Sequence, residues 1–239
     1  MAAPDSNPIA PSEVVAIDGP SGAGKCTIAR RLAEQLGYGF LDTGAMYRAV
    51  TWHFLARGVA PDSVGAEAEV GERGVRDALA HADLLLEDGR VWLNGQDVTA
   101  HLRTREVESR VSAVSALSFV RERMAELQRQ VARHGPIVAE GRDMGSVVFP
   151  LARWKVYLDA APEERARRRC EDFSRQGREV SQQGVLEEIL ARDLHDSTRA
   201  DAPLQRSPDA LYVDSTEMTA DGVISLLLAH VRDAQREAL

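Results

Sequence analysis

The chain has 239 residues and a formal net charge of −8, and its 29 basic residues are 27 arginines and only two lysines. A hydrophobic fraction of 44% and a charged fraction of 28% are typical of a folded globular protein, which excludes a disordered, collagen-like or coiled-coil chain. Duplex nucleic acid and anionic membranes attract basic surfaces, so we expect neither as a partner of this acidic chain.

The cysteines and the N-terminal segment indicate where the protein works. Cys26 and Cys170 are too few for a disulfide framework, and no spacing of a zinc site is present. Residues 1–12 lack the basic and apolar regions of a signal peptide, and no apolar run of about 18 residues follows. We therefore expect a cytoplasmic protein with a flexible tail over 1–12.

Strands and helices alternate in the first part of the chain. The β-branched run at 13–18 predicts a buried strand, and residues 24–36 predict a helix that ends at Gly37. A short strand at 38–42 and a helix at 43–57 follow. This order predicts a strand, a tight turn and a helix at the start of an α/β fold.

The pattern changes between residues 60 and 109. Asp88-Gly89 lies between two extended runs, which is a strong signal for a β-hairpin. Beyond it the alternation returns, with a helix at 121–133, strands at 136–139, 155–158 and 210–213, and a final amphipathic helix. Alternation predicts a mainly parallel sheet that binds ligands at the carboxyl ends of its strands, and the hairpin indicates an insertion.

A glycine-rich segment joins the first strand to the first helix. Residues 19–27 read GPSGAGKCT, which contains the spacing GxxxxGK. The glycines let successive backbone N–H groups point at an anion, the helix dipole adds positive charge, and a lysine reaches the outer phosphates. A plain glycine-rich turn is the alternative. The sequence predicts a loop that binds the phosphates of ATP, formed by Gly19, Pro20, Ser21, Gly22, Ala23, Gly24, Lys25, Cys26 and Thr27.

Position 26 departs from the usual pattern, because cysteine replaces the serine or threonine that offers a hydroxyl to Mg²⁺. A thiol is a poor ligand for this hard cation. Thr27 is the nearest hydroxyl, and Asp18 and Glu140 end strands beside the loop. We expect these three to order Mg²⁺, mainly through water; alternatively, the two carboxylates only cap strand ends, or metal-dependent catalysis is impaired.

Further motifs separate the possible classes of phosphate-loop protein. The only other lysine, Lys155, follows Trp154, so the guanine-reading motif NKxD is absent, and no segment resembles LSGGQ. Four segments closely resemble bacterial cytidylate kinases, in the same order: LDTGAMYRA (41–49), AEGRDMGSVVFP (139–150), RARRR (165–169) and RDLHDSTRADAPL (192–204). The resemblance runs from about Val14 to Val231.

The resemblance implies a nucleoside monophosphate kinase that transfers the γ-phosphate of ATP to CMP or dCMP with Mg²⁺, and we expect it to be a monomer. It implies the three-layer fold of phosphate-loop NTPases, with a central parallel sheet in a core of residues 13–59 and 114–239. The expected fold also has a monophosphate-binding insertion at 60–113, which is partly antiparallel and partly helical. A helical lid is expected at 168–186 within the core. An enzyme that prefers UMP and a nucleotide-binding regulator that has lost catalysis are the alternatives.

The resemblance also assigns contacts to the acceptor nucleotide. It implies that Arg48, Arg142 and Arg199 bind the acceptor phosphate, and arginine suits this because its planar fork binds phosphate oxygens bidentately. It implies base recognition by Ser112, Arg121 and Asp143; a carboxylate accepts from the amine of cytosine but faces an acceptor oxygen in uracil. The remaining contacts are assigned to Thr43, Tyr47, Arg192 and Asp196. Surface arginines, ordinary helix packing and an i,i+4 ion pair are the alternatives.

The run RARRR is the densest basic segment. Arg165, Arg168 and Arg169 occupy adjacent turns on one side of a predicted helix, and a polar segment follows. We expect Arg168 or Arg169, together with Lys25, to stabilise the transition state when the lid closes. A solvated helix face is the alternative.

Overall fold

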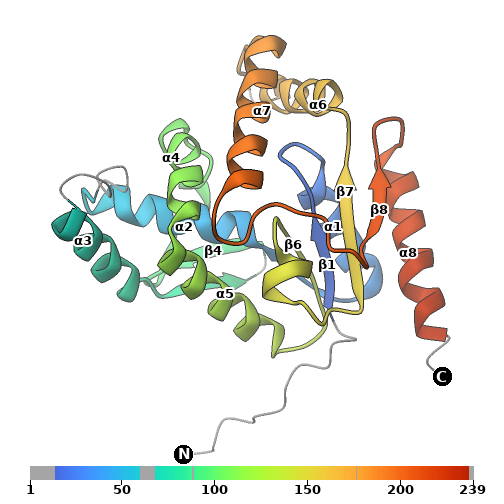
Figure 1. Ribbon diagram of the computed structural model, residues 1–239, viewed down its shortest axis with the longest axis horizontal. Helices are drawn as coiled ribbons and strands as arrows, with labels where there is room; N and C mark the ends of the chain where they lie inside the picture. The colour runs from blue at the N-terminus through green and yellow to red at the C-terminus, as the bar shows by residue number, and fades with distance from the viewer. Residues whose placement is uncertain (1–13, 60–67, 88, 176, 237–239) are drawn as a thin grey trace, which may run out of the picture. The chain divides into compact units, whose positions relative to one another are not determined.

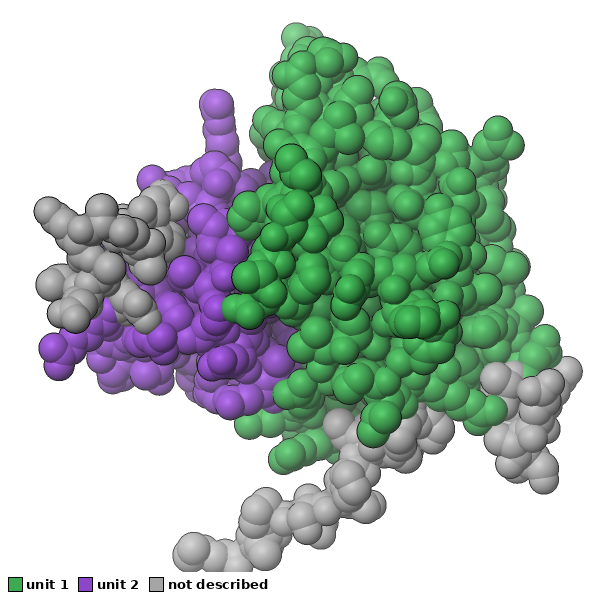
Figure 2. All heavy atoms as spheres, in the orientation of Figure 1, with its two compact units in different colours: residues 1–41, 129–239 green, residues 42–128 purple. Residues whose placement is uncertain are grey.

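The computed structural model describes residues 14–59, 68–87, 89–175 and 177–236 (Figure 1). The chain divides into two compact units (Figure 2): Met1–Leu41 with Arg129–Leu239, and Asp42–Gln128. The tail predicted at 1–12 lies outside the described residues. No helix in the described ranges is both long and apolar enough to span a bilayer.

The first unit is built on a five-stranded sheet with the order β2-β6-β1-β7-β8. The central strand β1 pairs in parallel with β6 and β7, and β7 pairs in parallel with β8. The predicted α/β fold with a central parallel sheet is therefore confirmed. The strands are β1 (Val14–Asp18), β2 (Gly39–Asp42), β6 (Ile137–Gly141), β7 (Trp154–Asp159) and β8 (Leu211–Asp214).

The register of the sheet brings three strand ends to one edge. Asp18, the last residue of β1, lies opposite Gly141 in β6 and Tyr157 in β7. Polar segments that leave the three strands therefore start from neighbouring points. This is the edge where an open parallel sheet binds its ligand.

Helices α1 (Lys25–Leu36) and α8 (Ala220–Arg236) pack together beside this sheet (Figure 1). Gly37 ends α1 in a left-handed conformation, with φ of 69°, and its N–H donates to the carbonyls of Ala33 and Glu34. The predicted helix stop is thus confirmed. The core here consists of buried apolar side chains from both helices and the sheet, including Ile17, Leu32, Trp154 and Leu227.

Three further helical segments belong to the first unit. Helix α6 (Pro162–Arg175) begins with a proline, whose missing N–H costs nothing in the first turn. Helix α7 (Gln182–Thr198) is capped by Ser181, whose hydroxyl accepts from the N–H of Gly184 at 3.0 Å. A short π-helical turn, η4 (Met144–Val148), follows β6.

The second unit combines helices with a small antiparallel sheet. Strand β3 (Leu84–Glu87) pairs with β4 (Arg90–Leu93), and β4 pairs with β5 (Gln96–Asp97). The predicted hairpin is confirmed, although Asp88 in its turn lies outside the described residues. The other elements are α2 (Thr43–Ala56), α3 (Ala68–Ala80), η3 (Thr99–His101), α4 (Arg105–Ala116) and α5 (Ser118–Ala132), which crosses the unit boundary at Arg129.

The second unit is larger than the insertion predicted at 60–113. It begins at Asp42 because Ala45 and Ala49 of α2 share an apolar core with Val91 and Leu93 of the hairpin. Local sequence patterns place α2 next to the first strands, but these tertiary contacts join it to the hairpin. The helix expected at 121–133 likewise begins earlier, at the start of α5.

Candidate active site

The glycine-rich loop leaves β1 and enters α1 at the ligand edge of the sheet. Gly19 has φ of +150°, and a Cβ atom there would lie 2.0 Å from the carbonyl oxygen of Leu158 in β7. Gly24 has φ of +84° and precedes the first residue of α1. These glycines let the loop pass close to the neighbouring strand and turn sharply into the helix.

Lys25, the first residue of α1, is buried, and its Nζ donates to the carbonyl oxygen of Pro20 at 2.8 Å. Burial, followed by the charges of Arg142 and Arg192, lowers the pKa of Lys25 from its ordinary value near 10.5 to about 7, although Glu140 and Asp18 oppose the shift. The loop thus holds a positive charge that its surroundings under-compensate. An anion bound here would supply the missing compensation.

Asp18 is buried at the end of β1 and joins the loop to the segment after β6. Its Oδ1 accepts from the N–H of Met144 at 2.7 Å, and its Oδ2 accepts from the N–H of Gly145 at 2.8 Å. Burial raises the pKa of this carboxyl to about 6, against these two hydrogen bonds. Asp18 therefore caps η4 and fixes the adjacent Asp143, which is itself buried.

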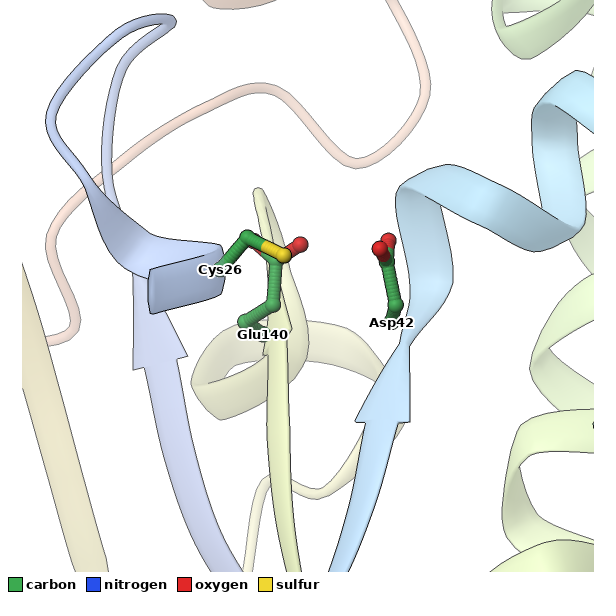
Figure 3. Close-up of side chains that lie close together, drawn as sticks. All are labelled: Cys26, Asp42 and Glu140. Carbon is green, nitrogen blue, oxygen red and sulfur yellow. The ribbon is translucent and has the colours of Figure 1, made fainter. Parts of the chain in front are cut away.

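Glu140 lies buried in β6 beside the start of α1. One of its carboxylate oxygens lies within 4.8 Å of the Sγ of Cys26 (Figure 3). Thr27 is exposed. Asp42, also drawn in Figure 3, ends β2 and caps α2 by accepting from the N–H of Ala45 at 2.8 Å. Glu140 is thus a hard oxygen donor next to the loop, as Mg²⁺ requires, whereas the thiol is not.

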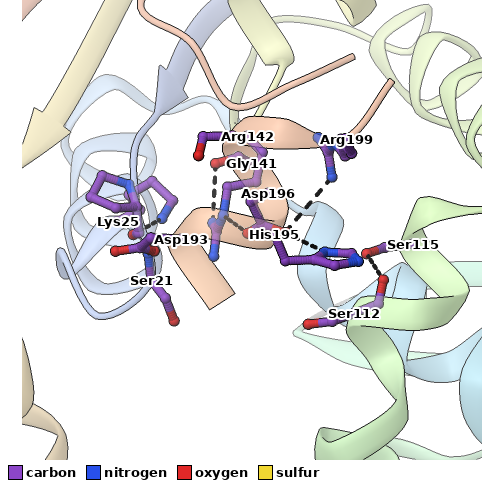
Figure 4. A network of polar contacts seen from close by, with 12 residues as sticks. Ser21, Lys25, Ser112, Ser115, Gly141, Arg142, Asp193, His195, Asp196 and Arg199 are labelled. Carbon is purple, nitrogen blue, oxygen red and sulfur yellow. Dashed lines mark hydrogen bonds and ion pairs between the residues drawn. The ribbon is translucent and has the colours of Figure 1, made fainter. Parts of the chain in front are cut away.

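Three predicted acceptor-binding residues of the first unit meet at one buried carboxylate. The Nε of Arg142 lies 2.9 Å from the Oδ2 of Asp196, and NH1 of Arg199 lies 3.9 Å from its Oδ1 (Figure 4). Burial alone would raise the pKa of Asp196, but Arg142, Arg192 and Arg199 outweigh it and lower this pKa. The sequence predicted Arg192 and Asp196 on one helix face with Arg199 on the next turn; the structure adds Arg142 to this cluster around Asp196.

The residues of the second unit that were predicted to bind the acceptor nucleotide lie on α2, α4 and α5. Thr43 and Tyr47 are one turn apart at the start of α2, and Arg48 follows Tyr47. The guanidinium of Arg121 lies 5.7 Å from the ring centroid of Tyr47, and its NH1 donates to the carbonyl oxygen of Ser115 at 3.0 Å. Ser112 lies on α4, where its carbonyl accepts from the Ser115 hydroxyl.

Arg168 and Arg169, one of which was expected to stabilise the transition state, have different surroundings. Arg168 donates from Nε to Glu164 at 2.8 Å and from both terminal nitrogens to Ser215, at 3.1 Å to the hydroxyl and 2.6 Å to the carbonyl. The guanidinium of Arg169 lies 5.3 Å from the ring centroid of Phe173. All donor nitrogens of Arg168 are therefore engaged away from the loop.

Two residues that the sequence analysis did not assign contact the loop directly. NH1 of Arg165 donates to the carbonyl oxygen of Ser21 at 2.9 Å, and the N–H of Ser21 donates to Oδ1 of Asp193 at the same distance. Arg165 was noted only as one member of RARRR, and Asp193 lies between the assigned Arg192 and Asp196. The only signal in the sequence that could have pointed to a role for Arg165 and Asp193 was their position within these motifs.

A family model described as cytidylate kinase matches residues 15–233. A cytidylate kinase of Thermodesulfovibrio yellowstonii is 41% identical over 92% of this chain and 98% of its own length. The cytidylate kinase of Carboxydothermus hydrogenoformans is 44% identical over 90% of this chain and 95% of its own length.

Longer relatives and a solved structure also match. A bifunctional pantoate ligase/cytidylate kinase of Nostoc sp. is 45% identical over 90% of this chain, which spans 40% of the length of that relative. The crystal structure of an uncharacterized protein from Eubacterium ventriosum has a TM-score of 0.51 at 12% identity and covers 93% of this chain and 99% of its own. The latter shows similarity of fold alone.

Proposed function

The chain belongs to the cytidylate kinase family, and on this premise we propose that it transfers the γ-phosphate of ATP to CMP or dCMP, giving ADP and CDP or dCDP. The observation that carries the proposal is the extent of the family match, which includes both the glycine-rich loop and the Asp196 cluster. Both features suit phosphate binding on physical grounds of their own.

The donor nucleotide is assigned to the glycine-rich loop. Backbone N–H groups at the start of α1 bind its phosphates, and the Nζ of Lys25 leaves Pro20 to reach their outer oxygens. Phosphoryl transfer needs aligned reactants and compensated charge more than covalent help. We assign transition-state stabilisation to Arg168 or Arg169, and Arg168 would first have to leave Glu164 and Ser215.

The acceptor nucleotide is assigned to arginines whose positions are set in advance. In the first unit, Asp196 holds Arg142 and Arg199, and Arg192 lies close enough to lower the pKa of Asp196. We assign the phosphate to Arg142, Arg199 and Arg48, and further contacts to Arg192, Asp196, Thr43 and Tyr47.

Base recognition is assigned to Asp143, Ser112 and Arg121. Asp143 is buried, and its backbone carbonyl accepts from the N–H groups of Val147 and Val148 within η4. The carboxylate of a residue whose backbone is fixed in this way can accept from the exocyclic amine of cytosine and repels the oxygen of uracil. This chemistry favours CMP over UMP by roughly 10² or more, because a mismatch leaves buried polar groups unpaired.

Glu140 is the residue best suited to hold Mg²⁺, through a water molecule. It is a buried oxygen donor beside the loop, whereas Asp18 is committed to two backbone N–H groups and Cys26 offers only sulfur. When bound, Mg²⁺ neutralises charge on the ATP phosphates. Thr27 would offer a further hydroxyl to the same ion, mainly through water.

The two alternatives predict different results. An enzyme that prefers UMP contradicts the chemistry of Asp143, and a regulator without activity would bind the nucleotides but not turn them over. A coupled assay with MgATP and CMP, dCMP, UMP or AMP separates them. We expect turnover with CMP and dCMP; faster turnover with UMP would refute the assigned specificity, and nucleotide binding without turnover would refute the activity.

We also propose that the protein acts as a cytoplasmic monomer. Neither Cys26 nor Cys170 forms a disulfide bond in the structure, which fits a reducing compartment. Light scattering after size-exclusion chromatography tests the monomer.

A further inference from the structure

The backbone of Ser21, the third residue of the glycine-rich loop, is hydrogen-bonded on both sides by a partly buried ion pair. Its N–H donates to Oδ1 of Asp193, and its carbonyl accepts from NH1 of Arg165, each at 2.9 Å. NH1 of Arg165 also contacts Oδ2 of Asp193, and its Nε donates to the carbonyl of Ala160 at 2.9 Å. We call these two side chains, Arg165 and Asp193, the loop clamp.

The loop clamp satisfies polar groups that would otherwise be buried without partners. Ser21 and Arg165 are 3% and 5% exposed. The Asp193 side chain is 17% exposed, and an ion pair between a buried and a partly buried group is a weak source of stability by itself, because partial removal of both charges from water opposes their attraction. It is well suited to fix geometry, since each charge is oriented by hydrogen bonds to backbone groups.

The two clamp residues lie on either side of the predicted lid at 168–186, on the two helices that contribute to it. Arg165 lies on α6 and Asp193 on α7, and the two helices share a small core that includes Ala166, Phe173 and Ile189. The pair therefore belongs to a helical hairpin with internal packing of its own. Every contact it makes to Ser21 links that hairpin to the loop.

Packing at the next residue strengthens the link. A Cβ atom at Gly22 would lie 3.2 Å from the Cβ of Arg165 and 3.5 Å from the Cδ1 of Ile189. Both helices thus contact the loop directly, just before its phosphate-binding N–H groups. A displacement of the hairpin would shift Ser21 and, with it, the backbone that leads to Lys25.

We propose that Arg165 and Asp193 are positioning residues for phosphoryl transfer, which hold the loop in its ATP-binding conformation and couple it to the α6–α7 hairpin. Neither touches the reacting atoms. This inference rests on the proposed function for its kinetic consequence, but its effect on ATP binding does not require that CMP be the acceptor.

The test compares graded variants in three measurements: the Kd for ATP without acceptor, the KM for each substrate, and the melting temperature. Arg165→Met and Asp193→Ala remove the clamp, and we expect each to raise the Kd and KM for ATP by at least about tenfold, since a small misplacement of a binding group has effects of this size. The KM for CMP stays within about twofold of the wild-type value, because the Asp196 cluster is intact.

Conservative variants test whether the hydrogen-bond geometry of the clamp, and not its charge alone, sets the affinity for ATP. Asp193→Asn keeps an acceptor for the N–H of Ser21, and Arg165→Lys keeps the charge but cannot reach Ala160 and Ser21 together. We expect both to lie between wild type and the full removals. They also keep the test decisive if Arg165→Met fails to fold.

Arg31→Met is the matched control. It removes another ion pair of the first unit between residues distant in sequence, Arg31 with Asp221, which joins α1 to α8 without contact to the loop. We expect its Kd and KM values to match those of the wild type. KM is independent of the fraction of active enzyme, so a purely structural role of the clamp would lower the melting temperature and the rate but leave the KM for ATP unchanged.

An unchanged Kd and KM for ATP in the clamp variants, with turnover of CMP by the wild type, would overturn this proposal and leave the proposed function intact. Absence of turnover in the wild type would instead refute the proposed function. The binding comparison with ATP alone would still decide whether the clamp positions the loop.

Discussion

Replacement of Lys25 by methionine is expected to stabilise the protein while it abolishes activity. Lys25 is buried, and its Nζ donates to a backbone carbonyl. Burial and the nearby charges of Arg142 and Arg192 disfavour its ammonium form. Methionine fills a similar volume without the charge, so Lys25→Met removes this cost together with the cation that the phosphates need.

The size of the effect follows from the pKa. A fall from 10.5 to about 7, at about 1.4 kcal/mol per pH unit, makes the buried charge cost on the order of 4 kcal/mol near neutral pH. Loss of the hydrogen bond to Pro20 reduces the expected gain in the free energy of unfolding by about 1 kcal/mol. We therefore expect Lys25→Met to raise the free energy of unfolding by about 3 kcal/mol at pH 7.

Urea denaturation at pH 7 measures this difference, and Lys155→Met provides the matched control. Lys155, the other lysine, is also buried but pairs with Asp209 at 2.7 Å. Its loss is expected to lower stability by about 1 kcal/mol. A Lys25→Met variant less stable than the wild type at pH 7 would refute the reasoning.

The pH dependence of the same difference provides an independent check. Between pH 7 and 10.5 the unfolded chain keeps the Lys25 proton that the folded chain has lost, so wild-type stability rises with pH in this window. The advantage of Lys25→Met should therefore shrink as the pH rises. Saturating ATP should stabilise the wild type by about 3 kcal/mol at a hundredfold excess over Kd and leave the variant unchanged.

Three further outcomes are expected. Gly19→Ala should disrupt the loop, because its Cβ would lie 2.0 Å from the carbonyl of Leu158, whereas Gly24→Ala meets no atom within 4 Å and should cost only about 1 kcal/mol of backbone strain; thermal melts and ATP titration compare the two. Asp196→Ala should destabilise the fold by about 3–5 kcal/mol in urea, because it leaves buried arginine charges uncompensated, and Asp196→Asn should destabilise it less. Asp143→Ala should lower the ratio of kcat/KM for CMP to that for UMP by about tenfold or more; an unchanged ratio would remove Asp143 from base recognition.

The glycine-rich loop and its setting could be predicted from the sequence because their signals are local. Glycine spacing, a β-branched run before it and an amphipathic helix after it identify β1, the loop and α1. The hairpin is predictable for the same reason, since Asp88-Gly89 encodes its own turn. In each case the residues that decide the structure are neighbours in the chain.

Contacts between distant segments could not be predicted in this way. Asp18 resembles a metal ligand in the sequence, but the structure shows that it caps η4, more than a hundred residues further along the chain. The loop clamp likewise requires that α6 and α7 pack together, which no local pattern reveals. The start of the second unit at Asp42 depends on the shared core of α2 and the hairpin.

The single lysine of the glycine-rich loop and the arginines around Asp196 have different electrostatic environments in the first unit. Arg142 and Arg199 share the carboxylate of Asp196, so their charges are partly compensated and their planar groups oriented before any ligand binds. Lys25 instead donates to a carbonyl, and the nearest arginines oppose its charge. Binding of phosphate therefore relieves a cost at Lys25 but gains mainly orientation at the arginines. A flexible, compact and under-compensated cation suits the phosphoryl group that moves, whereas a fixed fork suits the phosphate that stays.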